Sequence, residues 1–193
     1  MANLLPALTS TATKENRRLH DFYPTPRSAT EAVLPHIASW PKILWEPAAG
    51  NGAIVRVLEG AGYSVIASDR YDHSAGFSSG EEFDFTKAPM RRARSIVTNP
   101  PFERAREFIL SAKRLQVENM ALLLKADFFS AAKHAELFAL WRPRKILALN
   151  WRLDFTGAGA PHTNCVWVLW EGASASASAC EFDILKRPTL AIA

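Results

Sequence analysis

Short apolar runs alternate with stretches of helical periodicity along most of this chain, and this alternation constrains the fold more than any other feature. Such short runs suit strands of a sheet that is covered on both faces. Strands that alternate with helices are typical of an α/β fold. The expected strands are residues 43–46, 64–68, 95–98, 119–124, 145–150 and 165–170, with a short third strand or a turn at 83–85 and a final short strand at 181–185. The expected helices are residues 26–39, 53–60, 103–115 and 131–141.

Length and composition fit one globular domain. The chain has 193 residues, of which 48% are hydrophobic and 22% charged, which is ordinary for such a domain. Residues 1–20 show no periodicity, so we expect a flexible tail followed by a single domain at 21–193. No apolar run approaches the ~20 residues of a membrane span, and the start lacks the pattern of a secretory signal. We therefore expect a cytoplasmic protein without a membrane partner.

The chain contains two cysteines, Cys165 and Cys180. Two are too few for a disulfide framework, and their spacing is not that of a metal site. We therefore expect free thiols and no bound metal.

The quartet Asn99-Pro100-Pro101-Phe102 directly follows the apolar run at 95–98. It should lie at the carboxyl end of a strand, where open α/β sheets bind their ligands. The side-chain carbonyl of Asn99 and the backbone carbonyl of Pro100 are two acceptors, and the proline rings fix the backbone that carries them. Phe102 offers a flat face to a base.

Two preorganised acceptors suit the methylation of an exocyclic amine. They take the two N–H hydrogens of the amine and aim its lone pair at an incoming methyl group. The alternative interpretation of the quartet is a proline-rich turn after a buried strand, because short motifs also match by chance.

A glycine-bearing turn at residues 46–52 joins the first expected strand to the helix at 53–60. Small residues let a ligand approach the backbone, and the helix N-terminus presents free N–H groups. Asp69 closes the next strand and is suited to accept ribose hydroxyls, although a surface Asp in a loop is the alternative. Asp84 could accept the amino group of a cofactor adenine, with Phe85 beside the ring. The glycine patterns of dinucleotide and P-loop sites are absent.

The segment at residues 23–26 precedes the first expected helix. Thr25 is a plausible N-cap for that helix, and Pro26 a plausible first helical residue. Tyr23 fits either a core position or one wall of a cofactor pocket.

Over residues 21–171 these motifs resemble those of class I S-adenosylmethionine-dependent methyltransferases, specifically the small phage and prophage enzymes that methylate adenine N6 in DNA. The quartet is similar to the family's catalytic (Asn/Asp)-Pro-Pro-(Tyr/Phe/Trp) motif. Residues 46–52 are similar to its cofactor loop, in which Ala49 here replaces a cysteine. The resemblance implies catalysis by Asn99, Pro100, Pro101 and Phe102, and S-adenosylmethionine binding by Tyr23, Pro24, Thr25, Glu46, Pro47, Ala48, Gly50, Gly52, Asp69, Asp84, Phe85 and Asn99.

The resemblance also implies a Rossmann-like fold. Its sheet has seven mostly parallel strands in the order 3-2-1-4-5-7-6, with the seventh strand antiparallel and helices on both faces. Residues 83–85 would form strand three of that order. The implied reaction is direct displacement on an adenine that has been flipped out of the DNA helix.

A modest basic excess suits a polyanionic partner, here double- or single-stranded DNA. The net charge is +4. Lys125, Arg152 and Phe155 are candidate nucleic-acid contacts, and Phe155 would cover the opposite face of the base. The short connections leave no segment for a separate target-recognition domain. We therefore expect a weak or short sequence preference, read by loops 70–82, 126–133 and 152–164.

Several alternatives stay open. The same quartet occurs in enzymes that methylate guanine N2 of ribosomal RNA and, with tyrosine as the last residue, in those that methylate the glutamine amide of release factors. Cytosine N4 and adenine N6 of ribosomal RNA are chemically similar targets. A different class is a non-catalytic protein that binds S-adenosylmethionine and nucleic acid. A pyrimidine-C5 enzyme is excluded because neither cysteine follows a proline. The sequence leaves the oligomeric state open.

Overall fold

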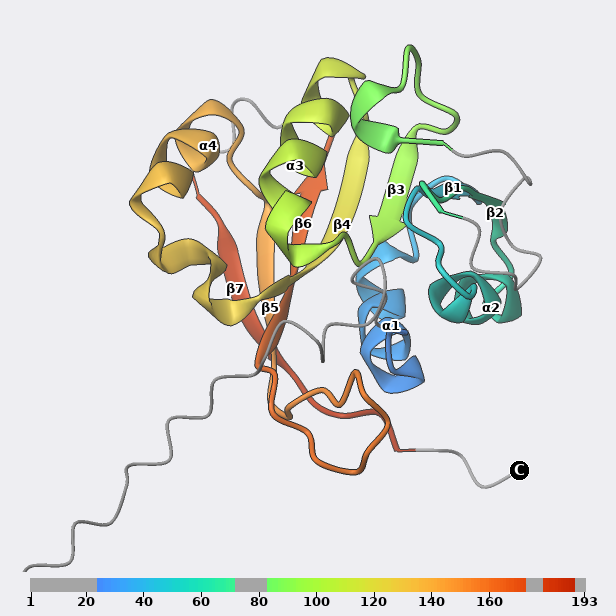
Figure 1. Cartoon of the computed structure of the whole chain (residues 1–193), viewed down its shortest axis with the longest axis vertical. Helices are drawn as coiled ribbons and strands as arrows, with labels where there is room; N and C mark the ends of the chain where they lie inside the picture. The colour runs from blue at the N-terminus through green and yellow to red at the C-terminus, as the bar shows by residue number, and fades with distance from the viewer. Residues whose placement is uncertain (1–23, 72–82, 173–178, 190–193) are drawn as a thin grey trace, which may run out of the picture.

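A computed structural model describes residues 24–71, 83–172 and 179–189. The strands in this part of the chain form one sheet in the order β2-β1-β3-β4-β6-β5-β7 (Figure 1). Strand β6 is antiparallel to both of its neighbours, and every other pairing is parallel. The strands are β1 (Ile43–Glu46), β2 (Ser64–Ala67), β3 (Ser95–Thr98), β4 (Asn119–Lys125), β5 (Lys145–Leu149), β6 (Cys165–Glu171) and β7 (Glu181–Leu185).

The four predicted helices are confirmed: the helix at 53–60 has the predicted bounds, and the other three have shorter α-helical parts. Pro35 explains one of these differences, because it has no N–H for a helical bond, and the chain continues from it as a 3₁₀ turn. None of the described helices is long and apolar enough to cross a membrane. The helices are α1 (Arg27–Val33), α2 (Ala53–Gly60), α3 (Ala105–Arg114) and α4 (Ala135–Leu140), and the 3₁₀ turns are η3 (Leu34–Ile37), η4 (Phe85–Lys87), η5 (Phe102–Arg104), η6 (Ala126–Ser130) and η7 (Ala132–His134).

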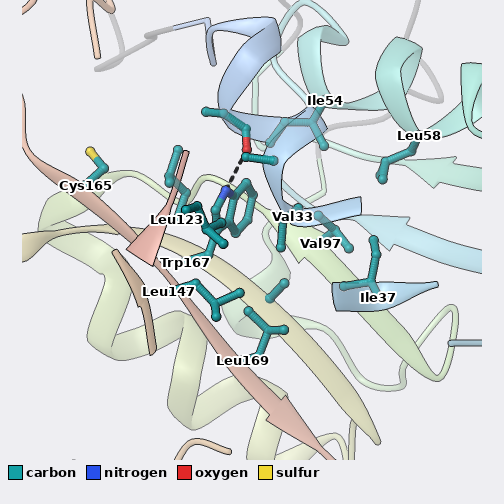
Figure 2. Packing of buried hydrophobic residues seen from close by; sticks show 14 of the residues in the cluster. Val33, Ile37, Ile54, Leu58, Val97, Leu123, Leu147, Cys165, Trp167 and Leu169 are labelled. Carbon is teal, nitrogen blue, oxygen red and sulfur yellow. Dashed lines mark hydrogen bonds between the residues drawn. The ribbon is translucent and has the colours of Figure 1, made fainter. Parts of the chain in front are cut away.

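Two apolar cores lie on the two faces of the sheet, because alternate strand residues point to opposite sides. Helices α1 and α2 cover one face, and α3 and α4 cover the other. Trp167 in β6 is fully buried on the first face, and its indole N–H donates to the carbonyl of Ala29 in α1 at 2.8 Å (Figure 2). This bond fixes α1 against the middle of the sheet.

Of the two alternatives predicted for residues 83–85, the turn is confirmed and the strand is wrong, so they do not form strand three of the implied order. Asp84 instead caps the 3₁₀ turn η4, and its side chain accepts the backbone N–H of Thr86. A side chain that captures a nearby N–H competes with a strand ladder for that donor. Among the described residues the sheet still has seven strands. The final expected strand, at 181–185, is confirmed as β7, which pairs with β5 at the side of the sheet opposite β2. The rest of the implied order, 2-1-4-5-7-6, is confirmed, including the antiparallel strand.

Some predictions concern residues outside the described ranges. These are the tail at 1–20, the position of Tyr23 and most of the loop at 70–82.

Candidate active site

The predicted site residues follow strands whose carboxyl ends meet at one edge of the sheet. Strands β1, β2, β3 and β4 are mutually parallel, and β5 runs the same way because β6 reverses between them. In Figure 1 the arrow of β3 points toward α1. Residues 46–52, Asp69, the quartet at 99–102, Lys125 and the loop after residue 149 therefore share this edge, which is where such sheets bind ligands.

The side-chain amide of Asn99 is held at one end and unpaired at the other. Its Nδ2 donates to the Thr25 hydroxyl at 3.0 Å. Its Oδ1 is buried and has no hydrogen-bond partner within the described chain. A buried acceptor without a partner costs about 1–3 kcal/mol. The site therefore holds an acceptor that a ligand N–H can satisfy.

Thr25 does not cap the first helix, so that prediction is wrong. The residue before α1 is Pro26, and no side chain caps the helix. Thr25 is only 6% exposed and faces Asn99 instead. The Thr25 hydroxyl accepts a hydrogen bond from Asn99 and does not accept one from the free N–H groups at the start of α1.

The two prolines of the quartet lie in an ordered turn. Pro100 is buried, and Pro101 is half-buried with φ −51°. The carbonyl that accepts the N–H of Arg104 in this turn, at 2.8 Å, belongs to Pro101. Turn formation therefore does not consume the Pro100 carbonyl, which is the second predicted acceptor.

Two of the predicted nucleic-acid contacts, Lys125 and Phe155, meet at Phe102. The ammonium of Lys125 lies 4.7 Å from the centre of the Phe102 ring. Phe155 meets the same ring edge-on, with centroids 5.7 Å apart, and is only 6% exposed. This edge-on contact leaves no room for a base between the two rings, so Phe155 must move if it is to cover the opposite face of a base. Arg152 is exposed in the same loop.

Asp154 orders the loop that carries Phe155, and sequence reasoning missed it. Its carboxylate accepts the Thr156 hydroxyl and the backbone N–H groups of Thr156, Gly157 and Gly159. These bonds lower the pKa of Asp154 to about 2, the Thr156 hydroxyl having the largest effect. Both glycines have positive φ. The signal was present in the sequence, since Asp154 and Gly157 are the residues preferred at the first and fourth positions of a type I turn.

The structure brings the glycine turn and Asp69 together, as predicted. The N–H of Gly50 donates to Asp69 Oδ2 at 2.8 Å, and the N–H of Tyr71 donates to Oδ1 at 2.9 Å. Gly50 and Gly52 both have positive φ, which only glycine adopts without strain. A carboxylate oxygen has two lone pairs and can accept more than one hydrogen bond.

Glu46 is fully buried beside the quartet. Its Oε1 accepts the N–H of Ala48 at 2.9 Å and the hydroxyl of Thr98, the residue before Asn99. Its Oε2 has no partner among the described residues. Burial raises the pKa of Glu46 to about 8. A cationic ligand would stabilise the ionised carboxylate here.

Asp84 is held by Arg104, which sequence reasoning also missed. The Nη2 atom of Arg104 donates to both Asp84 oxygens and to the Thr86 hydroxyl. Burial would raise the pKa of Asp84, but hydrogen bonds from Thr86 and the charge of Arg104 outweigh it and hold the pKa below its ordinary value. Arg104 had no signal in the sequence beyond following the quartet.

Phe85 lies in the core rather than at the surface of the site. It is 2% exposed and packs between Trp45 and Phe108, with ring centroids 5.0 and 4.9 Å away. This burial leaves almost no surface for a cofactor ring, so a core role fits Phe85 better than the predicted one.

No protein family and no curated protein matches the sequence. Solved structures do match the fold. A candidate class I S-adenosylmethionine-dependent methyltransferase from Listeria monocytogenes has a TM-score of 0.58 at 14% identity, over 83% of this chain and 65% of that one. A candidate RNA methyltransferase from Pyrococcus horikoshii has 0.57 at 15%, over 78% and 86%. The methyltransferase subunit of a type I restriction-modification system from Streptococcus thermophilus has 0.57 at 10%, over 78% and 45%.

The chain therefore has the fold of the class I S-adenosylmethionine-dependent methyltransferases. The cofactor that this fold implies is S-adenosylmethionine. The residues at the edge fit it, since the glycine turn, Asp69 and the unpaired buried oxygen of Glu46 match hydroxyl and cationic groups. This chain spans 65% of the Listeria protein and less than half of the Streptococcus subunit.

Proposed function

We propose that this protein transfers a methyl group from S-adenosylmethionine to an exocyclic amine of nucleic acid, namely N6 of adenine in DNA. The observation that carries the proposal is the unpaired, buried Oδ1 of Asn99 at the carboxyl end of β3. An amine N–H is the donor that this acceptor lacks. The fold similarity to a restriction-modification methyltransferase subunit supports DNA as the substrate.

In this proposal the quartet binds the target amine. Oδ1 of Asn99 and the carbonyl of Pro100 accept its two hydrogens, and Phe102 stacks on the flipped base. Bound S-adenosylmethionine supplies an electrophilic methyl group. The chain's own contribution is to orient the amine and to exclude water from it.

In this proposal the cofactor is bound by residues at or after the ends of the neighbouring strands. Asp69 receives the ribose hydroxyls, and Asp84 the adenine amino group. In the proposal, Glu46 and the turn that carries Pro47, Ala48, Gly50 and Gly52 contact the rest of the cofactor, as do Tyr23 and Pro24.

DNA binding falls to the exposed side chains around Phe102. Lys125 and Arg152 lie at the same edge of the sheet and are free to meet phosphates. We propose that residues 21–193 act as one catalytic domain, and that this domain has a weak or very short sequence preference. A cytoplasmic location and a small phage-type enzyme remain predictions of the sequence.

A second candidate is methylation of RNA, at guanine N2 or adenine N6. The fold similarity to the candidate RNA methyltransferase from Pyrococcus horikoshii favours it. The quartet would hold an RNA amine by the same two acceptors.

Labelled S-adenosylmethionine tests the proposal. The protein is incubated with single- and double-stranded random-sequence DNA, ribosomal RNA and a release factor, and the modified nucleoside or residue is identified by mass spectrometry. We expect N6-methyladenine in DNA. Label in RNA or protein alone would overturn the DNA assignment, and a rigid site longer than about four base pairs would overturn the weak preference, since each base needs its own contacts.

Asn99→Ala is the matching variant. It should abolish transfer while cofactor binding, measured by calorimetry, survives. The control is Asn119→Ala, which removes a half-buried amide that contacts Ser95 at the opposite end of the sheet. Cofactor binding without transfer by the native protein would identify a non-catalytic binder.

A further inference from the structure

The two ends of the Asn99 side chain have the same size but opposite chemistry. One end donates hydrogen bonds and the other accepts them, and a half-turn of the amide exchanges the two. Only the orientation with Oδ1 toward the site can accept an N–H from a target amine. The structure has this orientation, because Nδ2 is the end that contacts Thr25.

Thr25 is itself held in place by the fold. It is 6% exposed and directly precedes Pro26, whose carbonyl accepts the N–H of Ala29 at 2.9 Å in the first turn of α1. The carbonyl of Ala29 in turn accepts the indole N–H of Trp167, at the centre of the sheet (Figure 2). The hydroxyl of Thr25 is therefore positioned by the packing of α1 on β6.

We propose that Thr25 is a positioning residue that holds the amide of Asn99 with its carbonyl toward the target amine. The inference rests on the proposed function and gives Thr25 a role different from the cofactor contact implied by the family resemblance. Without an acceptor at position 25, this orientation leaves a buried NH₂ group facing a methyl group. The amide then turns or shifts, and fewer molecules present the acceptor to the amine.

Thr25→Val removes the acceptor and keeps the shape. We expect kcat to fall about tenfold, which corresponds to the loss of one hydrogen bond. The dissociation constant for S-adenosylmethionine should stay within about twofold of the native value. Thr25→Ser keeps the hydroxyl and should restore kcat.

Thr30→Val is the matched control. Thr30 lies in α1, five residues after Thr25, and is fully buried, but its hydroxyl has no partner within the described chain. The same substitution there should leave kcat and cofactor binding unchanged. If Thr25→Val does not fold, Thr25→Ala replaces it.

A second readout does not need activity. The Asn99 side-chain NH₂ resonances in an NMR spectrum are assigned by their loss in Asn99→Ala. They should move in Thr25→Val and stay in place in Thr25→Ser and Thr30→Val. Resonances that do not move in Thr25→Val would overturn the proposal, as would weaker cofactor binding at unchanged kcat.

Failure of the proposed function has a different signature. The native protein would then transfer no methyl group to DNA, whatever the NMR result. If the native protein is active and Thr25→Val is as active as Thr30→Val, only the role of Thr25 is wrong.

Discussion

The Nη2 atom of Arg104 lies 3.3 Å from both carboxylate oxygens of Asp84. Arg104 follows the quartet at 99–102 by two residues, and Asp84 caps the turn η4 that precedes β3. One ion pair therefore joins the segment proposed to hold the amine to the segment proposed to hold the cofactor adenine.

Arg104→Gln should weaken both stability and cofactor binding. Loss of this half-buried pair should lower the free energy of unfolding by about 1 kcal/mol. Because Arg104 helps to hold the pKa of Asp84 low, the stability from that carboxylate is present above its ordinary pKa and is lost as the pH falls through the lowered one. The difference between native and variant should therefore shrink in acid.

Chemical denaturation at several pH values measures this effect, and calorimetry measures a severalfold loss of S-adenosylmethionine affinity. Arg106→Gln, at an exposed position two residues along, is the control. Equal losses in both variants would contradict a specific role for Arg104.

Glu46 should make stability and cofactor affinity depend on pH. Its pKa is about 8 in the folded protein and near 4.5 when unfolded, so the folded state retains a proton that the unfolded state releases. The contribution of Glu46 to the free energy of unfolding should be greatest below about pH 4.5. It should decline as the pH rises and level off above about pH 8. Glu46→Gln should remove the decline, as seen in denaturation curves between pH 6 and 9.

S-adenosylmethionine is cationic and favours the ionised carboxylate, so its affinity should rise with pH over the same interval and its binding should release protons. Titration calorimetry in buffers of different ionisation enthalpy detects the released proton. Glu59→Gln, on the exposed side of α2, is the control. An affinity that is flat with pH in the native protein would refute this role for Glu46.

Trp167→Phe should destabilise the fold by roughly 2–4 kcal/mol. The smaller ring leaves a cavity, and the carbonyl of Ala29 loses its donor. Trp151→Phe is the matched control, because the Trp151 indole N–H is buried without a partner among the described residues. It should cost clearly less in thermal unfolding, and equal losses would mean that the bond to Ala29 contributes nothing.

Lys125→Gln should weaken DNA binding more than it slows the chemical step. A lysine that contacts one phosphate should also reduce the slope of log affinity against log salt by about 1. Fluorescence anisotropy at several salt concentrations measures both effects. Lys186→Gln, at an exposed position after β7, should change neither; a fall in kcat with unchanged DNA affinity would show that Lys125 acts through the Phe102 ring instead.

The parts of the fold that the sequence predicts well are those with a local signal. The strand before Asn99, the glycine turn and Asp69 each combine periodicity with a characteristic end, and the structure brings them to one edge. Residues 83–85 alternate like a strand, yet the contact between Asp84 and Thr86 closes a turn there. The hydrophobic periodicity of the sequence carries no information about a hydrogen bond between a side chain and a nearby backbone N–H.

The contacts that set the site's chemistry join residues far apart in the chain. Thr25 has the local pattern of a helix cap, and only the placement of β3 beside α1 turns it toward Asn99. Arg104 and Asp84 are twenty residues apart and share no periodic relationship. These contacts depend on the tertiary packing, which one sequence does not encode in any local pattern.

Strand β6 runs against its neighbours, so β5 ends and β6 begins at the ligand edge, and the chain between them stays there. This connection is the segment at 150–164, and the hydrogen bonds that Asp154 accepts from its backbone hold the segment in a defined conformation. New residues could be inserted at its tip without altering the turn beside Asp69. This architecture lets target choice evolve, or be engineered, separately from cofactor use.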